Sequence, residues 1–359
     1  MGRPPLALAH DYLTQRGGAE RVVATWCRSF PDAPLYTALY DPARTFDAFR
    51  THEVHTSWLN RVGFLRHDHR RALPLLAPTT SLQRIDAGVV LASSSGWAHA
   101  VRTEGRLIVY CHAPARWLYQ KDRYLAAGAL GGAATAAAHL LGSPLRAWDQ
   151  RAAQRADQYL ANSTFTQGLI RSVYGLDAPV IAPPVALPST LPADSDRSDV
   201  LIVARLLPYK NVDLAMEVAR ELSDLRFRVV GDGPLRESLE RSAPSNVSFA
   251  GAVDELDLWR EYTGTRVHLA LSHEDFGITP LEAAAAGRPT IARRSGGYLD
   301  TITESTGILL DEALINARSV AQAVRGALGR DWGRIDLQTH AANFSPARHI
   351  ERIQSFLGA

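Results

Sequence analysis

The sequence predicts an α/β protein made of two domains, each built on a doubly wound parallel sheet. Short apolar runs that suit buried strands alternate with amphipathic helical stretches along the chain. The alternation stops in a proline-rich polar stretch, residues 178–199, and then starts again. The length of 359 residues also exceeds one ordinary hydrophobic core. These observations together indicate two domains of similar construction.

In the first half, the strand candidates are apolar runs that end in polar residues or proline. They are LALAH (6–10), IDAGVVLASS (85–94), RLIVYCHAP (106–114) and the end of RAAQRADQYLANS. The stretch AERVVATWCRSF (19–30) has helical periodicity and follows the first strand. An alanine- and glycine-rich stretch at 125–142 is expected to form a helix or a flexible loop rather than a bilayer span.

The second half repeats the alternation. Its strand candidates are DVLIVARL, FRVVGDGP, NVSFAG, RVHLALS, PTIARR and GILL, with the helices NVDLAMEVARELSD and LRESLERSA among them. We expect domains at 1–183 and 200–342, a linker at 184–199 and a final segment at 343–359. Ligands of such sheets bind beyond the carboxyl ends of the strands, so a cleft between the two domains is the expected active site.

Composition narrows the class of protein. A net charge of +2 argues against a nucleic-acid partner. Cys27 and Cys111 are the only cysteines, which excludes a disulfide framework and favours a reducing, cytoplasmic compartment. The apolar run in MGRPPLALAHDYL is too short for a signal peptide, and we expect no membrane span.

The stretch HEDFGITPLEAAAAGRP, residues 273–289, carries two glutamates with seven residues between them. It follows a predicted strand, and Thr279 and Pro280 predict the start of a helix that ends before Gly287. One interpretation is structural: Thr279 and Glu282 match a capping box, in which the glutamate bonds back to the cap.

The other interpretation is a ligand site. The amides of Phe276, Gly277 and Ile278 could face a phosphate group. Nearby carboxylates only accept hydrogen bonds, so they would hold hydroxyl groups. Phosphates flanked by hydroxyl-binding carboxylates describe a nucleotide sugar. On this interpretation Glu274 binds the sugar hydroxyls and Glu282 binds the ribose hydroxyls.

A diphosphate also needs cations, and RLLPYKN (205–211) supplies Arg205 and Lys210 directly after a predicted strand. A solvated loop is the alternative interpretation. Lys121 and Lys210 are the only lysines among 39 basic residues, so a lysine here is informative.

The first half contains a similar arrangement in HDYLTQRGGAERVV. Gly17 and Gly18 precede a helix whose first turn carries Glu20, and a glycine pair allows close approach to a phosphate. An ordinary turn is the alternative. His112, in VYCHAP, follows a buried strand; it is either a satisfied structural histidine or a contact to the sugar or phosphate.

Taken together, these stretches resemble the retaining glycosyltransferases of family 4, which have the GT-B architecture of two Rossmann-like domains facing across a cleft. The resemblance is greatest to the bacterial branch related to GDP-mannose-dependent mannosyltransferases. It covers most of the chain and runs through HDYLTQRGGAERV, FPDAPLYTALYD, LASSSGWAHAV, VYCHAP, ANSTFTQGLIRSVYG, APPV, VARLLPYKNVDLA, VVGDGP and EDFGITPLEAAAAGRPTIA.

The resemblance implies roles for these residues. Arg205 and Lys210 would contact the diphosphate, and Gly17 and Gly18 would cover the donor phosphates. Glu274 would contact the donor sugar and Glu282 the ribose. The remaining implied contacts are the amides of Phe276, Gly277 and Ile278, which would line the sugar and phosphate, and His112, which would lie beside the transferred sugar.

The resemblance also implies an activity in polysaccharide biosynthesis. A hexose, mannose from GDP-mannose, would pass to a glycan, glycolipid or other lipid-linked, or small-molecule acceptor by same-face substitution without a metal or cofactor. The DxD pattern at Asp194 and Asp196 lies in the linker and is expected to be solvated. The segment FSPARHIERIQSFLGA resembles the last helix of this fold, which crosses back to the first domain. The stretch APARWLYQK after His112 departs from the family pattern on the acceptor side.

Alternatives stay open. The same fold and mechanism could use a UDP- or dTDP-sugar. A nucleotide-sugar 2-epimerase, a phosphorylase and a non-catalytic sugar-nucleotide-binding protein are further possibilities. The stretch RVGFLRHDHRR (61–71) predicts peripheral contact with anionic lipids on the inner face of the plasma membrane, and a solvated charged face is its alternative. Its charged and apolar residues are Arg61, Arg66, Arg70, Arg71, Phe64 and Leu65.

Overall fold

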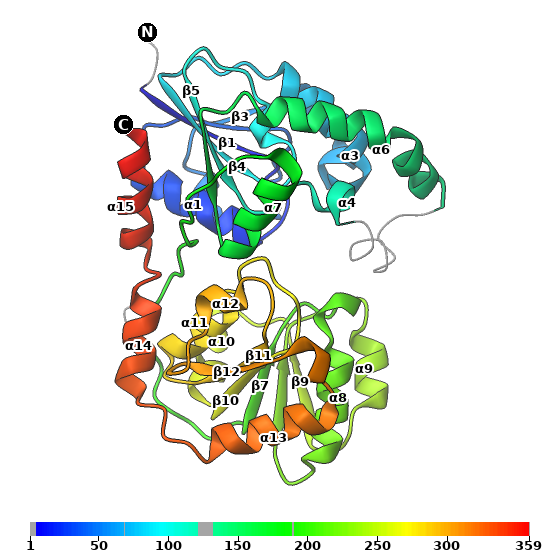
Figure 1. The fold of residues 1–359 in the computed structure, drawn as a ribbon, viewed down its shortest axis with the longest axis vertical. Coiled ribbons are helices and arrows are strands. Elements are labelled where there is room, and N and C mark those ends of the chain that lie inside the picture. Colours follow the sequence, from blue (N-terminus) through cyan, green and yellow to red (C-terminus); the bar gives the residue numbers. More distant parts are fainter. Residues whose placement is uncertain (1–4, 68, 121–131, 189, 359) are drawn as a thin grey trace. The chain divides into compact units, whose positions relative to one another are not determined.

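The computed structural model describes residues 5–67, 69–120, 132–188 and 190–358. The chain divides into two compact units (Figure 1), of which unit 1 comprises Met1–Pro184 and Pro346–Ala359, and unit 2 comprises Val185–Ser345. Each unit is built on a six-stranded sheet whose neighbouring strands are all parallel. The predicted fold class, two doubly wound α/β domains, is confirmed.

The sheet of unit 1 has the order β3-β2-β1-β4-β5-β6. Its strands are β1 (Leu6–His10), β2 (Leu35–Thr37), β3 (Val54–Thr56), β4 (Val89–Ser94), β5 (Arg106–Cys111) and β6 (Gln158–Ala161). The helices are α1 (Gly18–Ser29), α2 (Gly63–His67), α3 (His69–Leu82), α4 (Arg116–Tyr119), α6 (Gly132–Ala153), α7 (Thr164–Tyr174) and α15 (Pro346–Leu357), with short 3₁₀ turns η1 (Asp47–Phe49), η2 (Trp58–Arg61) and η3 (Ala98–Ala100). Of the alanine-rich stretch, residues 132–142 begin α6 and residues 125–131 lie outside the described residues.

Both faces of the unit 1 sheet are covered, so its central strands are apolar throughout. Along β1, Leu8 packs on the face that α1 and α15 cover, where Trp26 and Ile353 are also buried. Ala7 and Ala9 belong to the opposite face. The period of two in side-chain direction thus divides one continuous apolar run between two cores.

A buried histidine of the last helix, α15, forms hydrogen bonds with the rest of unit 1. Nε1 of Trp26 donates a hydrogen bond of 2.9 Å to Nε2 of His349, and Nδ1 of His349 lies 2.8 Å from the carbonyl oxygen of Ala182. Because a carbonyl only accepts, Nδ1 carries the proton and Nε2 is free to accept from the indole. Burial lowers the pKa of His349 to about 4, so the neutral form is the one that fits.

The sheet of unit 2 has the order β12-β11-β10-β7-β8-β9. Its strands are β7 (Val200–Val203), β8 (Phe227–Val230), β9 (Val247–Gly251), β10 (Val267–Ala270), β11 (Thr290–Arg293) and β12 (Gly307–Leu310). The helices are α8 (Val212–Glu221), α9 (Arg236–Ser242), α10 (Glu255–Thr263), α11 (Thr279–Ala285), α12 (Tyr298–Thr301), α13 (Ala317–Leu328) and α14 (Arg334–Ala342), with 3₁₀ turns η4 (Pro208–Lys210) and η5 (Glu312–Leu314).

The central strand of unit 2 is also divided between two cores. Val200 and Ile202 pack with the apolar residues of α8 and α13. Leu201 packs on the other face with Tyr262 of α10 and the alanines of α11. The small side chains of Ala283, Ala284 and Ala285 let α11 lie close against α14, which stands beside it in Figure 1.

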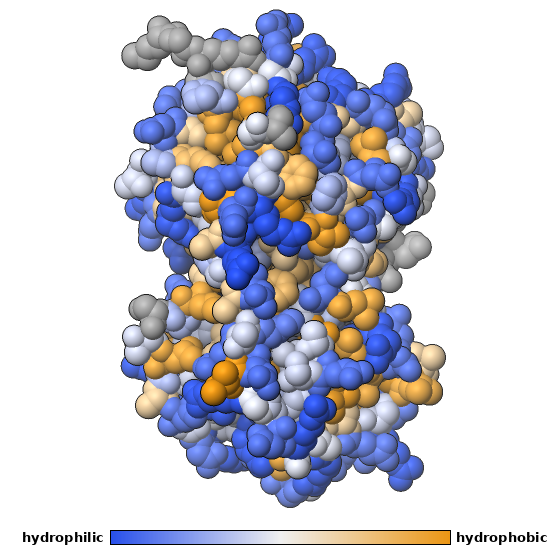
Figure 2. All heavy atoms as spheres, turned by 60° about the vertical axis from the view of Figure 1, so that its left-hand side comes forward, coloured by the Kyte–Doolittle hydropathy of each residue, from blue (hydrophilic) through white to orange (hydrophobic). Residues whose placement is uncertain are grey.

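The molecular surface is mixed in polarity. On the face shown in Figure 2, hydrophobic residues lie in small groups broken up by hydrophilic ones. Scattered apolar side chains of this kind are normal for a folded surface. In the part of the chain that the structure describes, no helix combines the length and the apolar character that crossing a membrane requires.

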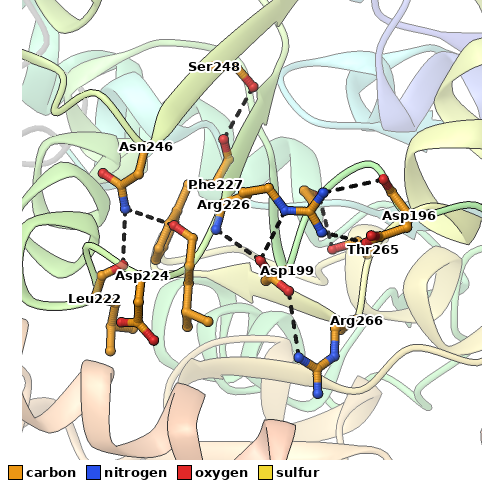
Figure 3. A network of polar contacts seen from close by, with 12 residues as sticks. Asp196, Asp199, Leu222, Asp224, Arg226, Phe227, Asn246, Ser248, Thr265 and Arg266 are labelled. Carbon is orange, nitrogen blue, oxygen red and sulfur yellow. Dashed lines mark hydrogen bonds and ion pairs between the residues drawn. The ribbon is translucent and has the colours of Figure 1, made fainter.

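Unit 2 begins with an irregular segment held by ion pairs, shown in Figure 3. Arg226 pairs with both Asp196 and Asp199, and Arg266 lies 3.6 Å from Asp199. Asp194 pairs with Arg334 at 2.6 Å and with Arg288 at 2.9 Å. Asp194 and Asp196 are exposed, as expected, and each also has an arginine partner. Exposed pairs of this kind contribute little to stability, because water screens their charges.

The neutral state of His349 predicts an acid-sensitive unit 1. Its folded pKa of about 4 lies below the ordinary value of 6.5, so stability is lost as the pH falls from 6.5 toward 4. By pH 5 the loss is about 2 kcal/mol. We expect His349→Gln, which keeps an acceptor for Trp26, to lose less thermal stability than the wild type between pH 7 and pH 5. The exposed His55→Gln serves as the control. Equal losses in His349→Gln and the wild type would contradict this account.

Candidate functional site

The loops after β7 and β10 meet at the centre of the unit 2 sheet. These two strands are neighbours, and the chain winds outward from them in opposite directions, through β8 and β9 on one side and through β11 and β12 on the other. Ligands of open α/β sheets bind at such a switch point, outside the carboxyl ends of the strands. The sequence places Arg205 and Lys210 in the first loop and Glu274 in the second.

The first loop is short and well fixed. Asn211 adopts a left-handed conformation with φ of 52° between η4 and α8. Its side-chain amide donates to the carbonyl oxygen of Leu271 at 3.0 Å, which ties the first loop to the second. Lys210 is the last residue of η4, directly before this tie, so its side chain is directed at the second loop.

Lys210 and Glu274 form an ion pair. The sequence predicted both residues as site residues but not their contact with each other. The side chain of Lys210 is 12% exposed and that of Glu274 is 26% exposed, so both are largely shielded from water. The Lys210 ammonium also lies 5.1 Å from the ring centre of Tyr209. Arg205 differs: it is exposed, and its guanidinium lies 3.4 Å from the Tyr209 hydroxyl.

A serine, itself in contact with a tyrosine, also holds Glu274 at Oε1, the same carboxylate oxygen to which the lysine donates. Ser272 donates to Oε1 of Glu274 at 2.7 Å, and the hydroxyl of Tyr298 lies 2.9 Å from Ser272 Oγ. A carboxylate only accepts, so Ser272 donates to Glu274 and accepts from Tyr298. Burial, followed by the charge of Glu274, raises the pKa of Tyr298 well above its ordinary value, which keeps this phenol protonated.

The turn around Phe276 and Gly277 requires glycine at two positions. Gly277 has φ of 87°, and a Cβ there would fall 2.5 Å from the ring of Tyr298. Gly296 has φ of 60°, and a Cβ there would fall on the carbonyl oxygen of Glu274. That same oxygen accepts from the amide of Gly297 at 2.8 Å. Two glycine-dependent turns therefore set the backbone of Glu274.

The amides of this turn have no internal acceptor. Across the described residues, the N–H groups of Phe276, Gly277 and Ile278 donate to no carbonyl and no side chain. Backbone donors near a protein interior normally have a partner, so three in a row mark a surface that water or a ligand occupies. The helix that follows begins at Thr279, with Ile278 as its N-cap and no side-chain cap bond.

The expected capping box is therefore wrong. Thr279 is the first helical residue rather than the cap, and Glu282 is 5% exposed with its Oε2 accepting from the Tyr262 hydroxyl at 2.8 Å. The tyrosine comes from α10, which the sequence pattern did not reveal. Glu282 is thus a buried carboxylate with a phenol donor, and its predicted contact to ribose stays a prediction.

A second polar cluster lies at the carboxyl edge of the unit 1 sheet. Strands β1 and β4 are neighbours at the switch point of this sheet. His10 ends β1, Ser93 lies near the end of β4, and His112 directly follows β5. Nε2 of His112 lies 2.8 Å from Ser93 Oγ, which in turn lies 3.0 Å from Nδ1 of His10.

The cluster continues to the first turn of α1. Nε2 of His10 lies 3.8 Å from Oε1 of Glu20, which also accepts from Gln15 at 2.9 Å. The separation of 3.8 Å is that of an ion pair rather than of a hydrogen bond. Gly17 has ordinary extended dihedrals, but a Cβ there would lie 2.5 Å from Oε2 of Glu20. One reason for glycine at 17 is therefore room for this carboxylate; the predicted contacts of Gly17 and Gly18 to phosphate stay predictions.

The charges in this cluster follow from burial and pairing. Burial alone lowers the pKa of His10, but its interactions with Glu20, Asp11 and the Ser93 carbonyl together outweigh burial and raise that pKa above the ordinary value. Burial, followed by the positive charge of His10, lowers the pKa of His112 well below its ordinary value. Of the two histidines, His10 is therefore the one whose surroundings favour the charged form, and His112 is the one held neutral.

Several of these residues had only a weak signal in the sequence. Ser272 and His10 each stand at a strand end, where polar residues of parallel sheets collect. Ser93, Tyr262 and Tyr298 have no local pattern that separates them from core residues.

In residues 61–71, Phe64 is 61% exposed and Leu65 is buried. The side chains of Arg70 and Arg71 lie outside those that the structure describes, as does Lys121.

Two doubly wound domains, each on a six-stranded parallel sheet, are the architecture of the GT-B fold. Residues 187–340, within unit 2, match the family described as Glycosyl transferases group 1. The chain is 31% identical over 326 residues to the GDP-mannose-dependent alpha-mannosyltransferase of Mycolicibacterium smegmatis, covering 84% of this chain and 78% of that protein. The chain therefore belongs to the group 1 glycosyl transferases.

Other relatives match over a shorter part. The chain is 30% identical over 165 aligned residues to the GDP-mannose-dependent alpha-(1-6)-phosphatidylinositol monomannoside mannosyltransferase of the same organism, and the match covers 38% of this chain and 43% of that relative. The alignment thus spans less than half of that relative. The expected resemblance to GT-B glycosyltransferases, GDP-mannose-dependent mannosyltransferases among them, is confirmed.

Solved structures share the fold over nearly the whole chain. The lipopolysaccharide outer core galactosyltransferase WaaB in its apo form has a TM-score of 0.67 at 15% identity, covering 97% of this chain and 98% of that one. Anabaena HepE in complex with UDP and glucose has a TM-score of 0.66 at 16% identity, covering 99% and 100%. At these identities the likeness concerns the fold alone.

The Glu274 turn gives the first prediction about the site. Gly296→Ala would force a Cβ onto the Glu274 carbonyl in a left-handed conformation, and we expect it to lower the unfolding free energy by about 2 kcal/mol. Gly326→Ala is the matched control, because Gly326 lies inside α13 with open space around it. There the same substitution should stabilise by about 0.5–1 kcal/mol. Changes of the same sign in urea unfolding of the two variants would contradict the proposed role of Gly296.

Proposed function

We propose that the chain is a retaining hexosyltransferase that moves mannose from GDP-mannose to a glycan, lipid-linked or small-molecule acceptor. The observation that carries the proposal is the shielded Lys210–Glu274 pair at the switch point of unit 2, in a chain of the group 1 transferase family. Mannose and GDP are favoured because the relative that aligns with 84% of the chain is named for both.

In this proposal the nucleotide-sugar donor separates the Lys210–Glu274 ion pair and binds to both side chains. Lys210 and Glu274 neutralise each other without a ligand, and each has a better partner in a nucleotide sugar. The diphosphate offers anionic oxygens to Lys210, and the sugar offers hydroxyl donors to Glu274. Ser272 and Tyr298 keep Glu274 in place while the lysine changes partners. Both partners of a buried pair would otherwise be costly to separate.

The remaining contacts complete the donor site. Arg205, exposed at the start of the same loop, adds a second cation for the diphosphate. The amides of Phe276, Gly277 and Ile278, which lack internal acceptors, bind the sugar and phosphate oxygens. Glu282 binds the ribose hydroxyls. In unit 1, Gly17 and Gly18 cover the donor phosphates and His112 contacts the transferred sugar.

The reaction is a same-face substitution. The bond between the anomeric carbon and the β-phosphate oxygen breaks first, and its electron pair leaves with the nucleoside diphosphate. The acceptor hydroxyl oxygen then bonds to the same face of the oxocarbenium-like sugar, and its proton passes to the departing phosphate oxygen. Arg205 and Lys210 stabilise the charge that develops on the diphosphate, so the proposed chemistry needs no metal. The protein contributes positioning and electrostatic stabilisation.

The acceptor side includes contact with a membrane surface. Phe64, which is 61% exposed, stands between Arg61 and Arg66 near the start of α2. An apolar side chain flanked by arginines suits the interface of a bilayer with anionic headgroups. A lipid-linked acceptor would then meet the protein at this segment.

Vesicle binding tests this membrane contact. We expect the wild type to sediment with phosphatidylglycerol vesicles at low salt, and an Arg61→Glu, Arg66→Glu variant to bind at least about tenfold more weakly, at about 1 kcal/mol per removed cation. The double variant Arg151→Glu, Arg171→Glu, at exposed positions of α6 and α7, carries the same change in net charge and is the control. Equal binding by both variants, or no binding by the wild type, would contradict the proposed contact with a membrane.

The donor site is tested by calorimetric titration with GDP, UDP, ADP and dTDP in the presence of a chelator. We expect GDP to bind most tightly, and GDP-mannose to be hydrolysed slowly when no acceptor is present. Preference for UDP or dTDP would contradict GDP-mannose as the donor but would leave the proposed transferase activity standing. Failure of every nucleotide to bind would overturn the donor site, and binding without hydrolysis of any sugar donor would favour a non-catalytic protein.

Two variants, studied by the same titration, test the separate roles of Glu274 and Glu282. Glu274→Ala should reduce turnover by about a hundredfold but change GDP affinity little, because its sugar contact strengthens in the transition state. Glu282→Ala should weaken the binding of GDP itself. Tyr262→Phe is the control, since it removes the phenol that donates to Glu282 but leaves the carboxylate. If Glu282→Ala binds GDP normally and only melts earlier, its role is structural.

A further inference from the structure

Four buried side chains of unit 1 form one continuous polar chain. It runs from Glu20 through His10 and Ser93 to His112, and each of the four is at most 5% exposed. The four come from α1, β1, β4 and the residue after β5, so the fold rather than local sequence assembles them. The contacts fix which atoms carry the protons.

The proton positions of His10 follow from its acceptors. Nδ1 lies 3.2 Å from the backbone carbonyl oxygen of Ser93, and a carbonyl only accepts. Nδ1 must therefore carry a proton. Nε2 is directed at the carboxylate of Glu20 at 3.8 Å, which also only accepts. The 3.8 Å separation is not a hydrogen bond and fixes no proton on Nε2, but the adjacent carboxylate favours an imidazolium at His10, in agreement with its raised pKa.

The proton of Ser93 is then determined as well. Its Oγ lies 3.0 Å from the protonated Nδ1 of His10, so it accepts from that nitrogen. Its own proton goes to the other neighbour, Nε2 of His112 at 2.8 Å. Nε2 of His112 therefore accepts, and a neutral imidazole that accepts at Nε2 carries its proton on Nδ1.

We infer that Glu20, His10 and Ser93 are positioning residues that hold His112 as its Nδ1–H tautomer, so that His112 offers the substrate a hydrogen-bond donor and not a base. Among the described residues, Nδ1 of His112 has no hydrogen-bond partner, which leaves this donor for an oxygen of the ligand. That the ligand is a sugar nucleotide rests on the proposed function. The tautomer is a property of the protein alone.

The electrostatics of the site agree with this assignment. His112 is neutral because burial and the neighbouring His10 charge both lower its pKa; Arg116 and His349 act in the same direction. The charge of His10 is compensated by Glu20 and by Asp11, which follows it in the chain. The carboxylate of Glu20 has room only because Gly17 lacks a side chain.

The tautomer can be measured without substrate or activity. In long-range ¹H–¹⁵N correlation spectra of histidine-labelled protein at pH 7, the two nitrogens of each imidazole differ for the two tautomers. We expect His112 to give the Nδ1–H pattern and His10 the pattern of a doubly protonated ring, with His112→Gln and His10→Gln used for assignment. An Nε2–H pattern for His112, or a neutral His10, overturns the inference.

A matched pair of serine variants links the tautomer to turnover. Ser93→Ala removes the donor to His112, whereas Ser94→Ala removes a neighbouring buried hydroxyl whose partner at 3.2 Å is His99. We expect Ser93→Ala to lose the Nδ1–H pattern and to lower kcat for donor hydrolysis roughly tenfold with nearly unchanged KM, the factor for loss of one hydrogen bond. Ser94→Ala should keep both the pattern and kcat.

The outcomes separate the inference from the proposed function. If no sugar nucleotide is hydrolysed by the wild type but His112 shows the Nδ1–H pattern only while Ser93 is present, the proposed function fails and the positioning role holds. If hydrolysis occurs and Ser93→Ala leaves both the pattern and kcat unchanged, the positioning role fails and the proposed function holds. Equal losses of kcat in Ser93→Ala and Ser94→Ala would make both serines merely structural.

Discussion

All strands of a parallel sheet end at the same edge, and this constraint governs where both units place their charges. In unit 1 the ends of β1, β4 and β5 bring together His10, Ser93 and His112. In unit 2 the loops after β7 and β10 bring together Lys210 and Glu274. The strands themselves are apolar because helices cover both faces, so the sheet edge is where polar side chains can converge. Each unit thus has one polar cluster at its switch point.

The two clusters differ in how far they are shielded from water. In the buried unit 1 cluster, Ser93 Oγ lies within hydrogen-bond distance of both His10 and His112, and His10 pairs with Glu20 at 3.8 Å. Such a network is costly to disturb, since removing one member takes a partner from its neighbours. The unit 2 cluster is partly open and lies beside three amides that have no acceptor among the described residues. The buried cluster fixes the positions of its members, whereas the partly open cluster has the exposure that the proposed exchange with a ligand requires.

The sequence predicted the elements that have clear periodicity and the loops that follow them. The six strands of unit 2 and the longer strands of unit 1 were found because each is a run of apolar residues ended by polar ones. Strands β2 and β3 were not, since three residues give no measurable period. The capping box at Thr279 failed for a different reason: the spacing matched, but the buried Tyr262 hydroxyl bonds the carboxylate of Glu282. Contacts between distant segments leave no local trace, and neither Ser93 nor Tyr298 could have been assigned without the fold.

The composition of the chain gives a last reason to regard Lys210 as selected for its chemistry. Arginine is the usual cation of this sequence, yet the cation between the carboxylate of Glu274 and the ring of Tyr209 is a lysine. A compact ammonium has three donors that rotate freely on a flexible stem, whereas a guanidinium needs a planar, two-pronged partner. In the proposed exchange, where the cation would leave Glu274 and follow a phosphate, the single rotating charge is the better choice. Arg205, which is exposed, is under no such restriction.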